Sequence, residues 1–233
     1  MKKLFFVILA LVSIVFADVN FNDGSVIDDI GIGGTYPNFK LLDSQAAGIW
    51  FLRGKFPAKW DRVRNDEFEL HDAIQEAYNT LKGIVKPKYD EYINKDATIL
   101  FRTTFGKYNF KTNSFPLDMV TKDTYFKFYG KNLVDDLYVY FDNPGEKERK
   151  LLMAPKQAKS FLQQRKNSNG WVDRTIYAKY YFKIKKIKTN VDDINSNTPD
   201  YSNTPDVTLI GHIYKVEIID PQSNKVIATI NKK

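Results

Sequence analysis

Aromatic and basic side chains alternate between residues 174 and 185, and their types could hold a ligand. Tyr177, Lys179, Tyr181 and Lys183 occupy every second position, so an extended strand places all four on one face. Side chains two residues apart on a strand lie about 6–7 Å from each other, which lets rings stack and ammonium groups meet one anionic chain. We therefore predict these four residues as candidate ligand-binding residues.

The same alternation can arise without a ligand in two ways. In the first, the face is an ordinary solvent-facing sheet surface, because tyrosine is common on strand exteriors and lysines there prevent unwanted pairing of strand edges. In the second, helices cover this face, and Tyr177 and Tyr181 belong to the core. The pattern favours these two structural roles over a binding face. Unfolding of a variant with both tyrosines replaced by alanine would identify a core role.

Residues for nucleophilic or metal-assisted catalysis are few. The chain has no cysteine and two histidines. His71 falls on the edge of a predicted helix, and His212 falls between Ile210 and Tyr214 of a predicted strand, where we expect a hydrogen-bonded core residue. No G-x-S-x-G or H-E-x-x-H motif is present. The sequence therefore predicts no catalytic residue, no metal site and no cofactor.

Carboxylate pairs leave one enzymatic alternative open. Asp135 with Asp136, or Glu217 with Asp220, could act as acid and base. Glycoside hydrolysis requires two such carboxyl groups about 5–10 Å apart in a cleft. Sequence spacing cannot show such a cleft, so a carboxylate-dependent hydrolase remains the alternative to a binding role.

The N-terminal segment Met1–Ala17 has the three parts of a cleavable secretory signal peptide. Lys2 and Lys3 precede an apolar run over residues 4–15, and a cleavage site fits after Ala17. The run is shorter than the ~20 apolar residues that span a bilayer. No cysteine follows it that could carry a lipid anchor. We expect a periplasmic or secreted protein without a transmembrane segment after cleavage.

The composition is that of a folded chain held together by packing. Hydrophobic residues make up 43% of the sequence and aromatic residues 15%, and the absence of cysteine excludes disulfides and thiolate metal sites. Cleavage would leave 233 − 17 = 216 residues with a net charge of about +7 − 2 = +5. This modest positive charge suits an anionic partner, or simply a soluble lysine-rich surface.

Helical periodicity is clearest from residue 67 to residue 82. Asp66 can cap this helix, and we expect it to end at Gly83 and Pro87. Shorter helices are predicted over residues 45–53 and 155–164. The apolar stripe of the long helix consists of Leu70, Ala73, Ile74, Ala77, Leu81 and Val85.

Strands dominate the second half of the chain because aromatic and β-branched residues are concentrated there. This order of elements predicts one α+β domain over residues 42–233 with a mainly antiparallel sheet. We expect strands over residues 97–105, 124–129, 137–141, 150–154 and 174–185, followed by a hairpin of 207–219 with 225–230.

Two segments lack the pattern of a helix or strand. Residues 18–41 show turn chemistry and no sustained periodicity, so we expect a flexible N-terminal segment. Residues 189–206 contain a direct repeat, in which Ser196–Asp200 and Ser202–Asp206 both read Ser-Asn-Thr-Pro-Asp. We expect a disordered loop there, because such polar repeats cannot bury themselves.

Two short patterns resemble a family of exported Gram-negative bacterial proteins that is known only as a domain of unknown function. The first is Phe105-Gly106-Lys107-Tyr108-Asn109-Phe110 with Phe115-Pro116-Leu117. The second is Met153-Ala154-Pro155-Lys156-Gln157-Ala158 with Phe161-Leu162 and a strand near Arg174. The resemblance covers roughly residues 60–230 and implies a cell-envelope location, but no activity and no functional residue.

These observations predict an exported cell-envelope protein with a non-catalytic binding role. Its expected partner is an envelope protein or an anionic envelope component, and we do not expect nucleic acid. The alternative is a carboxylate-dependent hydrolase acting on envelope glycan.

Overall fold

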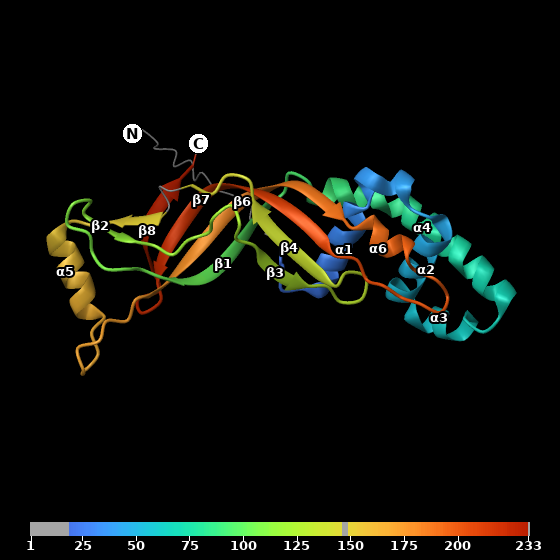
Figure 1. The fold of residues 1–233 in the computed structure, drawn as a ribbon, viewed down its shortest axis with the longest axis horizontal. Helices are drawn as coiled ribbons and strands as arrows, with labels where there is room; N and C mark the ends of the chain where they lie inside the picture. The colour runs from blue at the N-terminus through green and yellow to red at the C-terminus, as the bar shows by residue number, and fades with distance from the viewer. Residues whose placement is uncertain (1–18, 146–148, 233) are drawn as a thin grey trace, which may run out of the picture.

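The computed structural model describes residues 19–145 and 149–232. The predicted signal peptide, Met1–Ala17, lies outside the described residues. Figure 1 shows an elongated molecule with a bundle of helices at one end, a twisted sheet in the middle and a single helix, α5, at the other end. The predicted α+β class with a mostly antiparallel sheet is confirmed.

The central sheet has the strand order β1-β6-β7-β4-β3, and β8 pairs with part of β7. Its neighbours run antiparallel except for β4 and β7, which are parallel. The strand bounds are β1 Asp96–Thr104, β3 Phe126–Tyr129, β4 Asp136–Phe141, β6 Thr175–Thr189, β7 Val207–Asp220 and β8 Lys225–Asn231.

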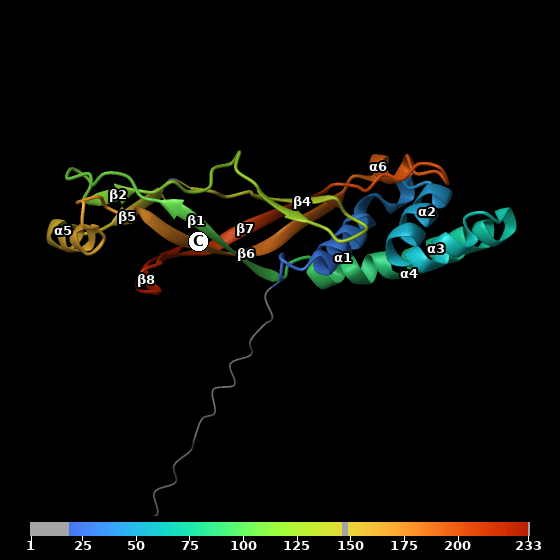
Figure 2. The ribbon, with the colours of Figure 1, turned by 90° about the horizontal axis from the view of Figure 1, so that it is seen from below.

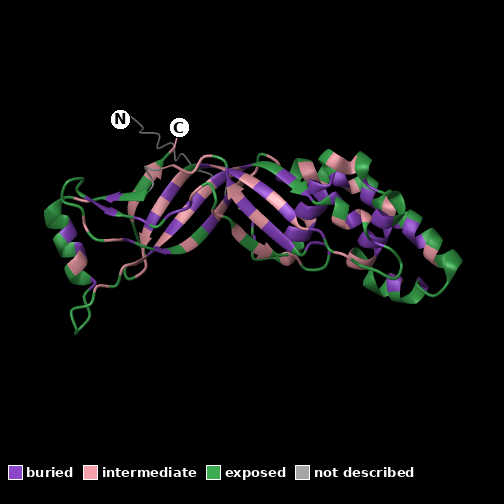
Figure 3. Ribbon diagram, viewed as in Figure 1, coloured by how far each residue is buried: buried purple, intermediate pink, exposed green. Residues whose placement is uncertain are grey.

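Strand β6 forms the spine of this sheet because every second residue is apolar or aromatic. Ile176, Ala178, Tyr180, Phe182 and Ile184 are completely buried, while the alternating side chains are half-buried or exposed. Full burial of each large side chain stabilises the fold by about 1.5–3 kcal/mol. Figure 3 shows this alternation as buried and less buried bands along the strands.

The helical end has its own apolar core, centred on Trp50, Phe51 and Leu81. The Leu70–Leu81 stripe of α4 faces this core: Ala73, Ile74, Ala77 and Leu81 are buried and Leu70 packs against the cluster, as the sequence predicts. The helices here are α1 Gly24–Gly34, a 3₁₀ turn η1 Tyr36–Leu41, α2 Ser44–Lys55, α3 Pro57–Val63, α4 Glu67–Tyr92 and α6 Val191–Asn195.

Helix α4 is ten residues longer than predicted, because it continues through Gly83 and Pro87 to Tyr92. A proline inside a helix removes one hydrogen bond and crowds the carbonyl four residues earlier. Here that residue is Gly83, where an added Cβ would meet no atom outside the helix's own backbone. The extension packs against α1, and Tyr92 is buried in the core of the sheet. Tertiary packing therefore outweighs the local stop signal.

The segment expected to be flexible, residues 18–41, is folded over its described part. Asp23 caps α1, and Ile27, Ile30 and Ile32 are fully buried. The turn-forming glycines that suggested flexibility instead permit close packing, since a Cβ on Gly33 would lie 2.8 Å from the backbone of Tyr89. The expectation of a flexible segment was wrong. The helix is short, and its glycines interrupt the apolar sequence pattern that would otherwise have predicted it.

The segment expected to be disordered, residues 189–206, is also folded. It contains α6, whose Val191 and Ile194 are buried in the helical core. Asn197 is 4% exposed, and its amide bonds to the backbone of Asn203 through both its oxygen and its nitrogen. The polar repeat therefore folds through side-chain-to-backbone hydrogen bonds, which composition alone does not reveal.

A buried carboxylate joins the helical end to the sheet. Asp28 of α1 is 6% exposed and accepts hydrogen bonds from four consecutive backbone N–H groups in the β3–β4 loop. The distances, 2.9–3.1 Å, span residues 131–134. This contact fixes the loop that leads into β4 and so positions Asp135 and Asp136.

The opposite end is a smaller layer of its own. Strands β2 Ser114–Pro116 and β5 Lys150–Leu152 pair antiparallel, and α5 Pro155–Gln164 packs Phe161 against Phe105 and Phe115. Figure 2 shows this layer and the helical end at opposite extremes of the molecule. None of the helices within residues 19–145 and 149–232 combines the length and the apolar composition needed to span a bilayer.

Candidate functional site

The four predicted ligand-binding residues lie where the alternation places them. Tyr177, Lys179, Tyr181 and Lys183 are all half-buried, on the face of β6 opposite the core. The residues that β6 contributes to the core stand at the intervening positions, from Ile176 to Ile184. Tyr177 and Tyr181 are therefore not core residues covered by helices.

Tyr181 is the centre of a closed polar network on this face. Its hydroxyl donates to Glu217 Oε2 at 2.6 Å, and Lys215 Nζ lies 3.6 Å from the centre of its ring. The hydrogen bond from Tyr181, followed by the Lys215 contact, lowers the pKa of Glu217. Lys215 balances the negative charge of Glu217, and the Tyr181 hydroxyl is already bonded to Glu217. The main role of Tyr181 is therefore to stabilise the surface of the sheet rather than to bind a ligand.

The two predicted lysines differ in what surrounds them. Lys183 Nζ contacts Asp96 at 3.1 Å and the carbonyl oxygen of Asn94 at 3.1 Å, so its charge is satisfied. Lys179 Nζ lies 4.9 Å from the Tyr181 ring centre and forms no ion pair with any described residue. The charge of Lys179 acts on Glu217, which faces it across the β6–β7 pair and whose pKa it helps to lower, but Lys179 is the lysine of the predicted set that no described acid holds in an ion pair.

A cleft of about 680 Å³ lies along the free edge of β1 and takes in Lys179. The two end strands of the curled sheet, β1 and β3, approach each other here, and Phe101 and Phe126 meet edge to face at 5.5 Å. Residues from three segments line the cleft: Val19–Asn22, Thr98–Phe101 and Phe126–Phe128, together with Lys179 and Ile219.

The backbone of β1 offers unused hydrogen-bonding groups to this cleft. Phe105 N–H donates to Arg174 O across the β1–β6 pair, whereas Thr104 O accepts from Asp118 on the other side. Antiparallel strands alternate the direction of these groups, so Leu100 and Arg102 also direct theirs away from β6. Neither has a backbone partner among the described residues. Leu100 is 59% exposed.

Strand β3 presents a second open edge across the cleft. Gly130 N–H donates to the carbonyl oxygen of Asp135, the residue before β4, so the alternation turns the backbone groups of Lys127 and Tyr129 away from β4. The segment Val19–Asn22 occupies part of the space between the edges, since Val19 bridges to Ala97 and Phe21 stacks on Phe128 at 5.1 Å. The remainder is the cleft.

The lining of the cleft is apolar with a positive rim. Its charged side chains among the described residues are Lys127 and Lys179, and none is acidic. Lys127 is held by Asp136 at 2.6 Å, and this hydrogen bond raises the pKa of its ammonium group. The described lining therefore has no acid–base pair, and its electrostatics favour an anionic or neutral occupant.

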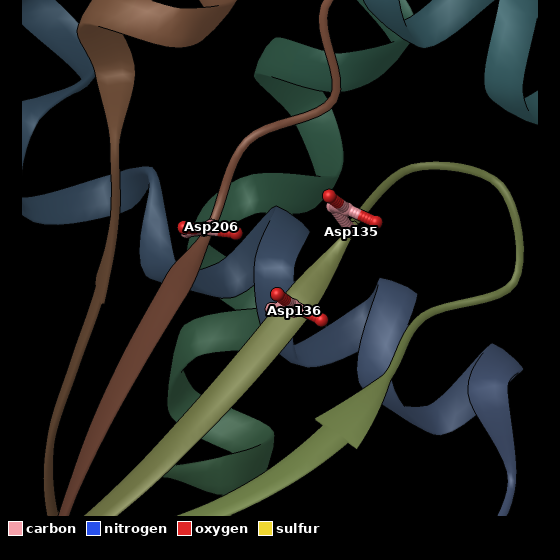
Figure 4. A group of neighbouring side chains, drawn as sticks. All are labelled: Asp135, Asp136 and Asp206. Atoms are coloured by element: carbon pink, nitrogen blue, oxygen red, sulfur yellow. The ribbon is translucent and has the colours of Figure 1, made fainter.

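The predicted carboxylate pairs do not form a catalytic cleft. Glu217 belongs to the Tyr181 network, and Asp220 pairs with the buried Arg165. Asp135 and Asp136 do come together, but at the start of β4, where they meet Asp206 from the start of β7. Figure 4 shows the three carboxylates at these adjacent strand ends.

Among the described residues, these three aspartates form the cluster whose geometry could hold a divalent cation. One oxygen from each residue lies within 4.8 Å of the others, a span that opposite oxygens around one Ca²⁺ also have at ligand distances of about 2.4 Å. Burial, and then the neighbouring charges of Asp136, Asp135 and Asp193, raise the pKa of Asp206. Asp136 is 7% exposed and already bonds to Lys127 and Tyr138.

His212 is not the core residue that the sequence predicts. Its side chain is 40% exposed, with Nδ1 2.8 Å from Asp142 Oδ1 and Nε2 3.1 Å from Asn143 Nδ2. Leu209, Gly211 and Ile213 are the buried residues of this stretch, so His212 lies on the outer face. The sequence analysis placed His212 on the wrong face of the strand, because Ile210 and Tyr214 on the outer face beside it are also large and apolar.

No sequence signal marked the cleft itself. Ile99, Leu100 and Phe101 form an apolar run typical of an ordinary core strand, and only the order of strands makes β1 an edge. Comparison of this chain with family models, with curated proteins and with solved structures finds no match, so the resemblance to an exported family stays a prediction.

Proposed function

We propose that this protein is a non-catalytic binding protein that accepts an extended segment of a partner protein in the cleft between β1 and β3. The observation that carries the proposal is the pair of open strand edges that face each other across an apolar cleft. An exposed edge gains main-chain hydrogen bonds when a strand is added, and alternate side chains of the added strand then enter pockets.

Both sides of the β1 edge can contribute to recognition. Ile99 and Phe101 belong to the core side of β1, whereas Leu100 and Lys179 belong to the outer side of the sheet. An added strand would place alternate side chains on these two sides. The preferred segment is therefore apolar at every second position, with an acidic residue placed to meet Lys179.

The predicted Tyr/Lys face enters this proposal at Lys179. Tyr181 and Lys183 have partners within the sheet, and the Tyr181 ring lies beside the Lys179 ammonium group. The proposal keeps the expectation of export, which places the partner outside the cytoplasm. Mass spectrometry of the mature chain should find Asp18 as its first residue; a chain that retains Met1 would contradict export.

A proline at position 100 tests strand addition directly. The N–H of Leu100 points into the cleft, so Leu100→Pro removes a donor that the β1–β6 ladder does not use, and proline is tolerated at such edge positions. Synthetic peptides of about six residues, alternating valine with aspartate or threonine, serve as probes. We expect Leu100→Pro to abolish peptide binding at an unchanged melting temperature.

Phe68→Ala is the matched control, because Phe68 is an exposed apolar residue on α4, outside the cleft lining. It should bind the peptides like the wild type. Peptide affinity that is equal in wild type and Leu100→Pro would refute strand addition at β1. A photo-reactive phenylalanine at position 100, compared with one at position 68, would identify the natural partner in cells.

A further inference from the structure

The end of the molecule opposite the helical bundle is built from residues 106–117 and 149–172, which we name the α5 tip. It contains β2, β5, α5 and a turn closed by the bridge between Lys166 and Val172. Figures 1 and 2 place α5 at the extreme of the long axis, with no other described element beyond it. The α5 tip is therefore the part of the described molecule that is free to meet an extended surface end on.

Large apolar side chains point into solvent at this tip. Phe110 is 77% exposed, Leu152 72% and Trp171 76%. Trp171 is held outward by a tight turn, in which its N–H donates to Asn167 Oδ1 at 3.0 Å and its carbonyl accepts from Asn167 N–H at 2.9 Å. Three large apolar side chains exposed on one small part of the molecule are typical of a surface that meets a partner or a membrane.

An apolar cavity of about 500 Å³ lies beside Phe110. Tyr108 and Phe110 form one wall, with their rings 4.9 Å apart, and the Tyr108 hydroxyl donates to Met153 O at 2.7 Å. Helix α5 forms the other wall and adds two lysines to the rim. Its lining residues are Pro155, Lys156, Ala158, Lys159 and Leu162.

The positive charge of the chain is concentrated at the same place. The α5 tip contains eight basic residues and no acidic one, whereas the whole chain carries +7, so the remainder carries 7 − 8 = −1. Apart from Arg165, which pairs with Asp220, none of these groups forms an ion pair with a described residue. The basic residues are Lys107, Lys111, Arg149, Lys150, Lys156, Lys159, Arg165 and Lys166.

We propose that the α5 tip docks onto the surface of a bilayer that contains anionic lipids. Phe110 and Trp171 act as interfacial anchors, since aromatic rings settle at the level of lipid headgroups. Lys156 and Lys159 meet lipid phosphates, and the cavity beside them accepts part of an acyl chain. Each lysine near an anionic surface strengthens binding by about fivefold. A soluble polyanion would use the lysines but would leave the cavity and both exposed rings without a role.

Trp171 is a native reporter of this event. The other two tryptophans, Trp50 and Trp60, are 2% and 8% exposed, so a change in the emission of the wild-type protein originates at the tip. We expect vesicles of phosphatidylglycerol mixed with phosphatidylcholine to shift this emission to shorter wavelength. Pure phosphatidylcholine vesicles should not, and about 0.5 M salt should largely reverse the shift.

Vesicle co-sedimentation of variants separates the anchors from general charge. Lys156→Gln with Lys159→Gln should weaken binding by about tenfold or more. Phe110→Ala should weaken it several-fold without changing the melting temperature, because the ring is exposed. The matched controls lie at the helical end: Lys40→Gln with Lys82→Gln, and Phe68→Ala, which are exposed and outside the tip. They should bind like the wild type.

Four results would overturn the proposal. The first is equal binding to neutral and anionic vesicles, and the second is an equal loss of binding in the control variants. The third is sedimentation with vesicles while the Trp171 emission stays unchanged, because binding would then use another face. Saturating binding of a soluble polyphosphate that displaces vesicles without shifting Trp171 would instead identify a polyanion site. None of these outcomes affects the peptide experiment at Leu100, which concerns a separate part of the molecule.

Discussion

The two ends of this molecule use similar residue types for different purposes. At the helical end Trp50, Phe51 and Leu81 are at most 2% exposed, and lysines such as Lys88 pair with acids. At the α5 tip Phe110 and Trp171 are more than three-quarters exposed and the lysines at the cavity rim have no ion pair with a described residue. The helical end also has an exposed ring, Phe68, so what distinguishes the α5 tip is that an exposed ring, Phe110, and two lysines without ion pairs to described residues line one apolar cavity.

The largest expected effect tests the helical end of this comparison. Leu81→Asp places a carboxylate at a fully buried position, where an unpaired charge is far more costly than the loss of the apolar side chain. We expect the variant to be unfolded or to melt many degrees below the wild type by circular dichroism. Phe110→Asp makes the same kind of change at the α5 tip and should leave the melting temperature nearly unchanged. Equal destabilisation would erase the difference between the two ends.

The next effect concerns the contact between the helical end and the sheet. Asp28→Ala leaves four buried or partly buried backbone N–H groups without their acceptor, and each lost partner costs about 1–3 kcal/mol. We expect a loss of at least about 3 kcal/mol in the free energy of unfolding, measured with urea. Asp61→Ala, an exposed acid on α3, is the control and should change stability by less than about 0.5 kcal/mol.

A smaller effect on stability is expected on the outer face of the central sheet. Tyr181→Phe removes one hydrogen bond to Glu217 and should lower the free energy of unfolding by about 1 kcal/mol. Tyr177→Phe has no such bond to lose and should be neutral. If both changes are neutral, the Tyr181 network contributes nothing to folding, and the whole face becomes a stronger candidate for ligand contact.

The smallest effect is expected at Asp206, and it depends on pH. Burial and neighbouring aspartates raise the pKa of Asp206 in the folded protein, so the folded state binds its proton more tightly than the unfolded state. The free energy of unfolding therefore falls as pH rises from about 3.8 through the raised pKa. Asp206→Asn should melt slightly above the wild type at pH 7, and this gain should vanish below pH ~4.

Thermal melts of the wild type and of Asp206→Asn between about pH 4 and pH 7 test the sign of this stability difference. A lower melting temperature for Asp206→Asn at pH 7 would show that the ionised carboxylate stabilises the fold. Repeating the melts with Ca²⁺ and with a chelator asks whether a bound cation is the reason, because a ligand that binds only the folded state raises its melting temperature.

The strands of the sheet could be predicted from sequence because each carries its own signal. Residues 175–184 alternate so strictly that their buried and less buried sets can be assigned residue by residue, whereas the bulge after Ile184 and the extension of β6 to Thr189 were not predicted. The predicted helix bounds were wrong where contacts with distant residues decide them. Helix α4 continues past Pro87 because Val85 and Tyr92 are buried. Helix α1 forms because its isoleucines pack against the sheet and the helical core.

The cleft and the α5 tip could not be found in this way. Local patterns report which face of a strand is buried, but they do not report which strand lies at the edge of a sheet. Leu100 has the residue type of a core position, but its side chain lies on the outer face of the sheet, and its backbone groups are open because β1 ends the strand order. Phe110 and Trp171 likewise needed the fold to show that no described residue covers them.

By itself the sequence determined the α+β class, the mostly antiparallel pairing, the inward stripe of α4 and the common face of Tyr177, Lys179, Tyr181 and Lys183. These follow from periodicities of the backbone, which act over a few residues. The tertiary structure decided which of those side chains keep a free charge, where β1 and β3 meet, and that the basic residues of two separate segments converge at one end. These features depend on contacts between residues far apart in the chain, and no local pattern encodes such contacts.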